Sequence, residues 1–323
     1  MSAAISLKAP SVRRNEIEKR IDILEDDILE IDAALLKLLL ADKTTGDTIL
    51  WCTKDYEENG SEFAEAEHMT VSLITGIFSR VIQPRAAKSK AVQRARSQKR
   101  AEVFTPSWVC NEQNNLIDEA WFGRPNVFNV PDGVSWIVTE GQIEFPGGDR
   151  TWQSYVDARR LEITCGEAPY LISRYDTTTG DVIPLYSRIG LFDRKMRVVN
   201  ENCKTDEEWL TWSQRALWST YGYEFQGDSV LIARENLLYD YLDYYKARFG
   251  TVPPRSLLRT IANIISWNIW QMDGLKYIVP YSDQPTEENP LAGSGTYCLI
   301  RDWIGRHSVP FISLLKGGSY GTV

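Results

Sequence analysis

Hydrophobic residues near the N-terminus recur with alternating gaps of four and three positions, and many Glu and Asp residues lie between them. This spacing is the a/d seam of an amphipathic helix over three heptads. It predicts either contact with a second copy or a partner subunit, or packing of the helix on its own domain. The seam residues are Ile17, Ile21, Leu24, Ile28, Ile31, Leu35 and Leu38.

Shorter patterns follow this helix. Gly46 is a stop signal, and the apolar residues 49–53 predict a short strand. Residues 123–150 are rich in Gly, Pro and Asn and contain alternating apolar positions, which predicts a hairpin. Further patterns predict helices over residues 206–218 and after Pro253-Pro254, and a strand over residues 297–300.

A turn that suits a small charged ligand lies within residues 160–176. The segment reads as a strand with Glu162 at its end, a turn at Cys165 and Gly166, and a helix opened by Pro169. Gly166 lets the backbone approach a ligand, and Pro169 loses no hydrogen bond at a first helical position. The expected helix N-terminus would direct N–H donors and a positive dipole at the turn. The alternative is an ordinary strand–turn–helix connection.

The composition limits the kinds of partner that this chain is expected to bind. The chain has 323 residues with a net charge of −8, which excludes a uniformly basic nucleic-acid binder. The five cysteines form no CxxC pair and there are only two histidines, which argues for reduced thiols and against a structural zinc site. No apolar run approaches the roughly 20 residues that span a bilayer. We therefore expect a cytoplasmic protein without a metal or membrane partner.

One basic block interrupts this acidic composition. Residues 80–100 contain eight Lys and Arg residues and no acid. Such a block suits contact with nucleic-acid phosphates, although a solvated surface segment would have the same composition. The residues expected to contact phosphates are Arg85, Lys88, Lys90, Arg94, Arg96, Lys99 and Arg100.

Residues 162–171 resemble the first ligand-binding motif of amino-group DNA methyltransferases, (D/E)-P-x-C-G-x-G-x-F-L. Here the motif reads Glu-Ile-Thr-Cys-Gly-Glu-Ala-Pro-Tyr-Leu, and Ile163 and Ala168 depart from its commonest letters. Upstream, Phe104-Thr105-Pro106 is similar to the Phe-Thr-Pro motif that precedes the first motif in γ-order N6-adenine methyltransferases. Downstream, residues 221–225 and the helical run after them resemble the second motif, a strand that ends in an acid.

The resemblance implies an α/β fold, with a Rossmann-like sheet in reduced form that binds S-adenosylmethionine and carries an N-terminal helical extension. Its acid at the second strand end implies a contact between Glu224 and the cofactor ribose. Asp273 stands where the third motif places an acid near the cofactor adenine. The expected cofactor-binding residues are Phe104, Thr105, Pro106, Glu162, Thr164, Cys165, Gly166, Ala168, Glu224 and Asp273.

One family motif is missing. N6-adenine methyltransferases carry (N/D/S)-P-P-(Y/F) after the fourth strand, and this chain has no such tetrapeptide. By position, Asp302 and Trp303 are the nearest substitutes. Asp302 would accept a hydrogen bond from the adenine amino group, and Trp303 would stack on the flipped base.

These motifs imply an S-adenosylmethionine-binding DNA (adenine-N6) methyltransferase-like protein, similar to the modification subunit of a restriction–modification or related phage system. The alternative is an inactive relative that serves as a DNA-binding or regulatory subunit. We expect three regions: a heptad-patterned helix over residues 1–45, a small α/β region over residues 46–150, and the methyltransferase-like core over residues 151–323.

Overall fold

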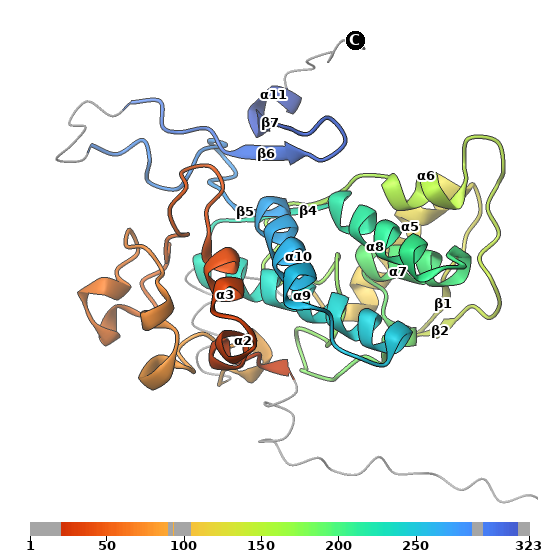
Figure 1. Ribbon diagram of the computed structural model, residues 1–323, viewed down its shortest axis with the longest axis horizontal. Helices are drawn as coiled ribbons and strands as arrows, with labels where there is room; N and C mark the ends of the chain where they lie inside the picture. The colour runs from red at the N-terminus through yellow and green to blue at the C-terminus, as the bar shows by residue number, and fades with distance from the viewer. Residues whose placement is uncertain (1–20, 90–92, 94–104, 286–292, 316–323) are drawn as a thin grey trace, which may run out of the picture.

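The computed structural model describes residues 21–89, 93, 105–285 and 293–315 (Figure 1). Seven of the residues predicted from the sequence to bind a partner or ligand therefore lie outside the described part. They are Ile17 of the helical seam, Phe104 of the Phe-Thr-Pro motif, and the basic residues Lys90, Arg94, Arg96, Lys99 and Arg100.

The described chain is a mixed α/β structure built around a short parallel sheet. Strands β3 (Arg160–Glu162), β4 (Thr220–Glu224) and β5 (Ile269–Gln271) pair in the order β3-β4-β5. Both pairings are parallel, with Glu162 opposite Gly222 and Glu224 opposite Gln271. The carboxyl ends of all three strands therefore meet at one edge of the sheet.

Helices connect these strands. Helices α7 (Leu191–Asn202) and α8 (Asp206–Trp218) lie between β3 and β4, and α9 (Gly227–Phe249) and α10 (Arg255–Asn268) lie between β4 and β5. Parallel neighbours need such crossover connections. As predicted, the helix over residues 206–218 forms, and Pro254 precedes the first residue of α10. Helix α9 ends at Gly250, whose φ of 69° is the left-handed conformation of a glycine C-cap.

The N-terminal seam does not form one continuous helix, so that prediction was wrong. Helices α2 (Glu25–Ile31) and α3 (Ala33–Leu40) are separated by Asp32, which is extended with φ −167° and ψ 116°. The Asp32 carboxylate accepts a hydrogen bond from Ala34 N–H and pairs with Arg259 on α10. The break is thus stabilised by a helix cap and an ion pair with the core.

The described seam residues pack mostly within the chain. Ile21, Ile28 and Leu35 are at most 1% exposed, whereas Ile31 remains exposed. Helix α3 packs against α9 and α10, and the buried Arg234 on α9 donates a hydrogen bond to the carbonyl of Leu39. Packing on the chain's own domain is therefore the arrangement found for these three side chains. Contact with another subunit stays a prediction, and it would have to use other residues.

Residues 49–53 form no regular strand, contrary to the sequence prediction. Instead, the side-chain carboxamide of Gln271 pairs with the backbone of Leu50, as a peptide group of a neighbouring strand would. Leu50 N–H donates to Gln271 Oε1 at 2.8 Å, and Gln271 Nε2 donates to Leu50 O at 2.8 Å. A side chain of the core thus occupies the hydrogen-bonding groups that a neighbouring strand would use.

Two antiparallel hairpins stand apart from the parallel sheet. Strands β1 (Asn129–Asp132) and β2 (Ser135–Val138) form the hairpin predicted within residues 123–150. Strands β6 (Leu299–Asp302) and β7 (His307–Pro310) form the second, which lies with α11 (Phe311–Leu315) at one side of the molecule (Figure 1). The predicted strand at residues 297–300 therefore exists, shifted by two residues, but it belongs to a separate sheet.

The remaining elements are helical. Helix α5 (Ser107–Phe122) follows the Thr-Pro pair, and α6 (Trp152–Asp157) precedes β3. Short 3₁₀ helices lie at Glu57–Asn59, Ser61–Phe63, Val71–Leu73, Gly76–Phe78, Arg85–Ala87 and Leu185–Ser187.

Candidate functional site

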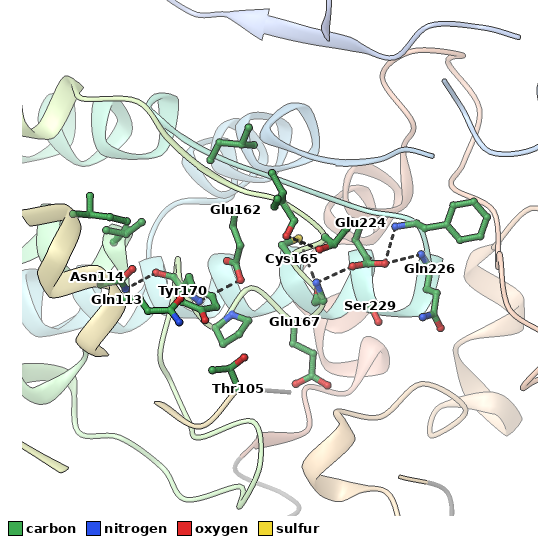
Figure 2. A pocket seen from close by; sticks show the side chains of 18 of the residues that line it. Thr105, Gln113, Asn114, Glu162, Cys165, Glu167, Tyr170, Glu224, Gln226 and Ser229 are labelled. Carbon is green, nitrogen blue, oxygen red and sulfur yellow. Dashed lines mark hydrogen bonds between the residues drawn. The ribbon is translucent and has the colours of Figure 1, made fainter. Parts of the chain in front are cut away.

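A cavity of about 940 Å³ opens at the carboxyl ends of β3 and β4 (Figure 2). Its walls come from the turn after β3, the end of β4 with the start of α9, one face of α5, and single residues such as Cys52 and Thr105. Cavities of this size hold small molecules, and the carboxyl ends of parallel strands are their usual position in α/β proteins. This cavity is our candidate site.

The turn after β3 has an unusual backbone. Thr164, Gly166 and Ala168 have φ angles of 46°, 53° and 64°, all left-handed. For Thr164 and Ala168 this conformation is costly, and such strain persists where the surrounding structure fixes it. Cys165 N–H donates to Tyr223 O on β4 at 2.9 Å, which anchors the turn to the sheet. The turn is thus a fixed wall of the cavity.

No helix follows Pro169, so the predicted helix N-terminus and its dipole are absent from the turn. Ala168 O accepts from the N–H groups of Leu171 and Ile172, which closes a single turn. The chain then forms a loop with a short 3₁₀ helix at Leu185–Ser187, and the next α-helix is α7. Gly190 precedes α7 because a Cβ there would lie 2.3 Å from Leu171 O. A close backbone crossing, invisible in local sequence patterns, replaces the expected helix.

Glu162 lies in the middle of the cavity wall and stabilises the turn. Its carboxylate accepts hydrogen bonds from the N–H groups of Tyr170 at 3.4 Å and Leu171 at 3.2 Å. Burial raises the pKa of Glu162 well above its ordinary value, with a smaller contribution from the negative charge of Glu224. Glu162 therefore stabilises the turn as a hydrogen-bond acceptor. Its raised pKa means that the carboxyl group gives up its proton less readily than an ordinary glutamic acid.

Glu224 ends β4 and joins the same turn. Its Oε2 accepts from Gly166 N–H at 2.9 Å, and its Oε1 accepts from the N–H groups of Phe225 at 2.7 Å and Gln226 at 3.2 Å. Burial raises its pKa, and these backbone hydrogen bonds oppose that shift. A carboxylate has about four acceptor directions. Three are occupied here, which leaves one for a ligand donor.

The cysteines do not supply a reactive thiolate. All five are free and buried. Burial raises the pKa of Cys165 well above its ordinary value, with further contributions from Glu162 and Glu224. A thiol of this kind is a poor nucleophile because the thiolate is the reactive form. Cys165 therefore serves as a small packed residue of the turn.

The structure brings most of the motif residues together. Thr105, Glu162, Thr164, Cys165, Gly166 and Glu224 all line the cavity. Ala168 belongs to the turn but is only 1% exposed and does not line the cavity. Pro106 precedes α5 and does not line the cavity. Asp273 follows β5 and does not line it either. The Asp273 carboxylate instead accepts from Leu275 N–H at 2.9 Å and closes its own loop.

Asp302 and Trp303 lie away from this cavity. Trp303 Nε1 donates to Asn268 Oδ1 at 2.8 Å, and its ring stacks on Trp218 with centroids 6.0 Å apart. Asn268 and Trp218 precede β5 and β4, so Trp303 is at the amino ends of the strands. Asp302 Oδ1 accepts from the N–H groups of the turn that follows it. The structure therefore does not bring the residues predicted to hold the base to the predicted cofactor site.

Of the basic block, two of the expected phosphate-contacting residues are described. Lys88 Nζ lies 3.5 Å from the buried carboxylate of Asp228 in the first turn of α9. The backbone N–H of Arg85 donates to Glu167 Oε1 at 2.6 Å. Lys88 thus forms an internal ion pair with Asp228, and its contact with phosphates stays a prediction. Its charge compensates that of Asp228.

A large part of the cavity wall consists of residues that no sequence motif had indicated. Among the missed residues are Cys52, Gln113, Asn114, Ile117, Leu161, Leu191, Gln226 and Ser229. Most of them lie on helices whose sequence pattern signals only amphipathic packing. Their position at the site follows from where α5 and the N-terminal segment pack, which no local motif encodes.

Within residues 21–89, 93, 105–285 and 293–315, no cluster of three or more His, Cys, Asp or Glu side chains has the arrangement of a metal site. None of the helices in that part is both long and apolar enough to cross a bilayer. Comparisons of the whole chain with protein-family models, with curated proteins and with solved structures found no match.

Proposed function

We propose that the cavity binds S-adenosylmethionine and that the parallel strands form a reduced Rossmann-like sheet. One observation carries the proposal: the turn at Gly166 and the acid at the end of the next strand, Glu224, meet in one cavity at the carboxyl ends of the strands. That arrangement matches the general position of nucleotide ligands in open α/β sheets. The free acceptor direction of Glu224 suits a ribose hydroxyl.

The proposed reaction is methyl transfer to an amino group of DNA, with adenine N6 as the acceptor implied by the motifs. Such a transfer needs positioning of two substrates more than covalent catalysis. The cavity's fixed turn agrees with that requirement. DNA as the partner rests on the basic block, of which Lys88 is already paired within the chain.

The test is binding of S-adenosylmethionine by calorimetry to the full chain and to Gly166→Leu. A Cβ at Gly166 meets no atom within 4 Å, so the side chain would project into open space at the turn. We expect the variant to stay folded and to lose measurable affinity. Gly250→Leu is the matched control, since Gly250 is also left-handed with no atom near its Cβ. Equal affinity in all three proteins would remove this site from consideration.

A second candidate function is that of a cofactor-binding subunit that transfers no methyl group. The position of Asp302 and Trp303 at the amino ends of the strands favours it, because no predicted base-binding residue is left at the cavity. Methyl transfer from labelled S-adenosylmethionine to DNA of mixed sequence separates the two. Binding without transfer supports the subunit, and transfer supports the enzyme.

A further inference from the structure

The cavity continues beyond the groups assigned to the cofactor. Figure 2 shows Gln226 and Ser229 at one end and Gln113 and Asn114 at the other, with Glu162 between them. We call the second part the α5 end. It is lined by Gln113, Asn114 and Ile117 on α5 and by Leu161, Ile163 and Leu191. Among these residues, Ile163 belongs to the first motif, and the other five lie outside the motifs that suggested a cofactor site.

Aliphatic side chains from two directions line the α5 end. Ile117 comes from the helix, whereas Leu161 and Ile163 come from β3 and the residue after it. Their exposed fractions are 40%, 43% and 62%, high for side chains of this kind. Exposed aliphatic groups gathered in a concave site usually mark a ligand surface. Flat aliphatic walls suit the faces of a planar ring.

Gln113 supplies an exposed and free carboxamide at this end. Its side chain is exposed, and its carboxamide makes no hydrogen bond with any described residue. The amide nitrogen of the neighbouring Asn114 is engaged, since its Nδ2 donates to Tyr170 O at 2.9 Å and to Ile189 O at 3.1 Å, whereas its Oδ1 accepts no hydrogen bond from the described residues. These two hydrogen bonds fix this turn of α5. Gln113 is therefore presented from a rigid backbone, which favours specific recognition.

We propose that the α5 end binds a nucleobase, with the Gln113 carboxamide paired to its edge and the aliphatic residues against its faces. A carboxamide offers one donor face and one acceptor face, and it pairs with the adjacent amino group and ring nitrogen of adenine. The inference rests on the proposed function, because it assigns the second substrate of the same cavity. It also replaces Asp302 and Trp303 with residues that lie at the cavity.

The test uses free adenine and S-adenosylmethionine as separate probes of the full chain, each titrated by calorimetry. Gln113→Leu removes the carboxamide at nearly constant size, and Glu224→Ala removes the acid at the other end. We expect Gln113→Leu to weaken adenine binding about tenfold to hundredfold and to leave S-adenosylmethionine binding unchanged. Glu224→Ala should give the opposite pattern. Because Gln113 is exposed, unchanged melting of its variant confirms that the fold is intact.

The outcomes separate the two proposals. If adenine does not bind, or if its affinity falls with Glu224→Ala and not with Gln113→Leu, the inference is overturned. If S-adenosylmethionine fails to bind while adenine keeps its dependence on Gln113, the proposed cofactor is wrong and the nucleobase site stands. Loss of both ligands in Gln113→Leu with an unchanged melting temperature would show a single shared site and overturn the division into two ends.

Discussion

The two edges of the parallel sheet are stabilised by opposite kinds of side-chain hydrogen bond. At the carboxyl edge, the side chains of Glu162 and Glu224 accept from the N–H groups of turns. At the amino edge, the side chains of Lys195 and Asn268 donate to backbone carbonyls. The first arrangement leaves a cavity in which the Glu224 carboxylate can accept one more hydrogen bond. The second is closed by the stacked rings of Trp218 and Trp303.

The comparison teaches where a ligand can bind. An edge completed by donors and aromatic rings is a packed part of the core, where side-chain donors such as Lys195 Nζ and Asn268 Nδ2 are used within the chain. The carboxyl edge, where carboxylates hold the strained turn, keeps a free hydrogen-bond acceptor direction and an open cavity. Position in the sheet, more than residue type, therefore separates Glu224 from Asp302. The predictions below test this difference.

The largest effect is expected at the amino edge. Lys195 is fully buried, and its ammonium donates to Ala158 O at 2.7 Å and Ser219 O at 3.1 Å. Lys195→Met would leave these carbonyls without their donor, at a cost of about 3 kcal/mol in the free energy of unfolding. Urea denaturation measures it, with the exposed Lys204→Met as control. A loss equal to that of the control would show that the edge does not depend on this ammonium.

At the carboxyl edge, Glu224→Ala should act mainly on the ligand. Loss of a charge-assisted hydrogen bond would weaken S-adenosylmethionine binding by about 1.5–3 kcal/mol. Glu224→Gln keeps an acceptor for Gly166 N–H, so it separates loss of charge from loss of the turn. Calorimetry of S-adenosylmethionine binding to the two variants measures the affinity lost with the charge and the affinity lost with the turn. Unchanged affinity in both would contradict the ribose contact.

The raised pKa of Glu162 makes a prediction about pH. A carboxyl group whose pKa is higher in the folded state binds its proton more tightly there, so its contribution to stability is greatest below the unfolded value of about 4.5. That contribution is lost as pH rises through the folded pKa, by up to about 1.4 kcal/mol per pH unit. Glu162→Gln should therefore flatten the fall in stability above pH 4.5. Denaturation at a series of pH values measures it, and identical slopes would contradict the shift.

The smallest effect is expected for Trp303→Phe. The variant removes the hydrogen bond to Asn268 Oδ1 and keeps an aromatic ring against Trp218. We expect a loss of about 1 kcal/mol in stability and no change in the affinity for S-adenosylmethionine or adenine. A melting curve and calorimetry measure the two quantities. Weaker adenine binding without a change in stability would return Trp303 to the ligand site.

The sequence by itself determined the local features of this protein. It placed the strand end at Glu162, the turn at Gly166, the acid-ended strand at Glu224 and the helices over residues 206–218 and after Pro254. Each depends on hydrophobic period and on backbone preferences of Gly and Pro, which act over a few residues. The resemblance to the methyltransferase motifs also predicted that Gly166 and Glu224 would share one site.

Only the tertiary structure decided which residues share a surface. It broke the N-terminal helix at Asp32, replaced the helix after Pro169 with a loop, and placed Trp303 at the far edge of the sheet. It also brought Gln113 to the cavity. The physical reason is the same in each case. Long-range packing and hydrogen bonds, such as those of Arg259 with Asp32 and of Asn114 with Tyr170 O, join residues far apart in the chain and outweigh weak local propensities.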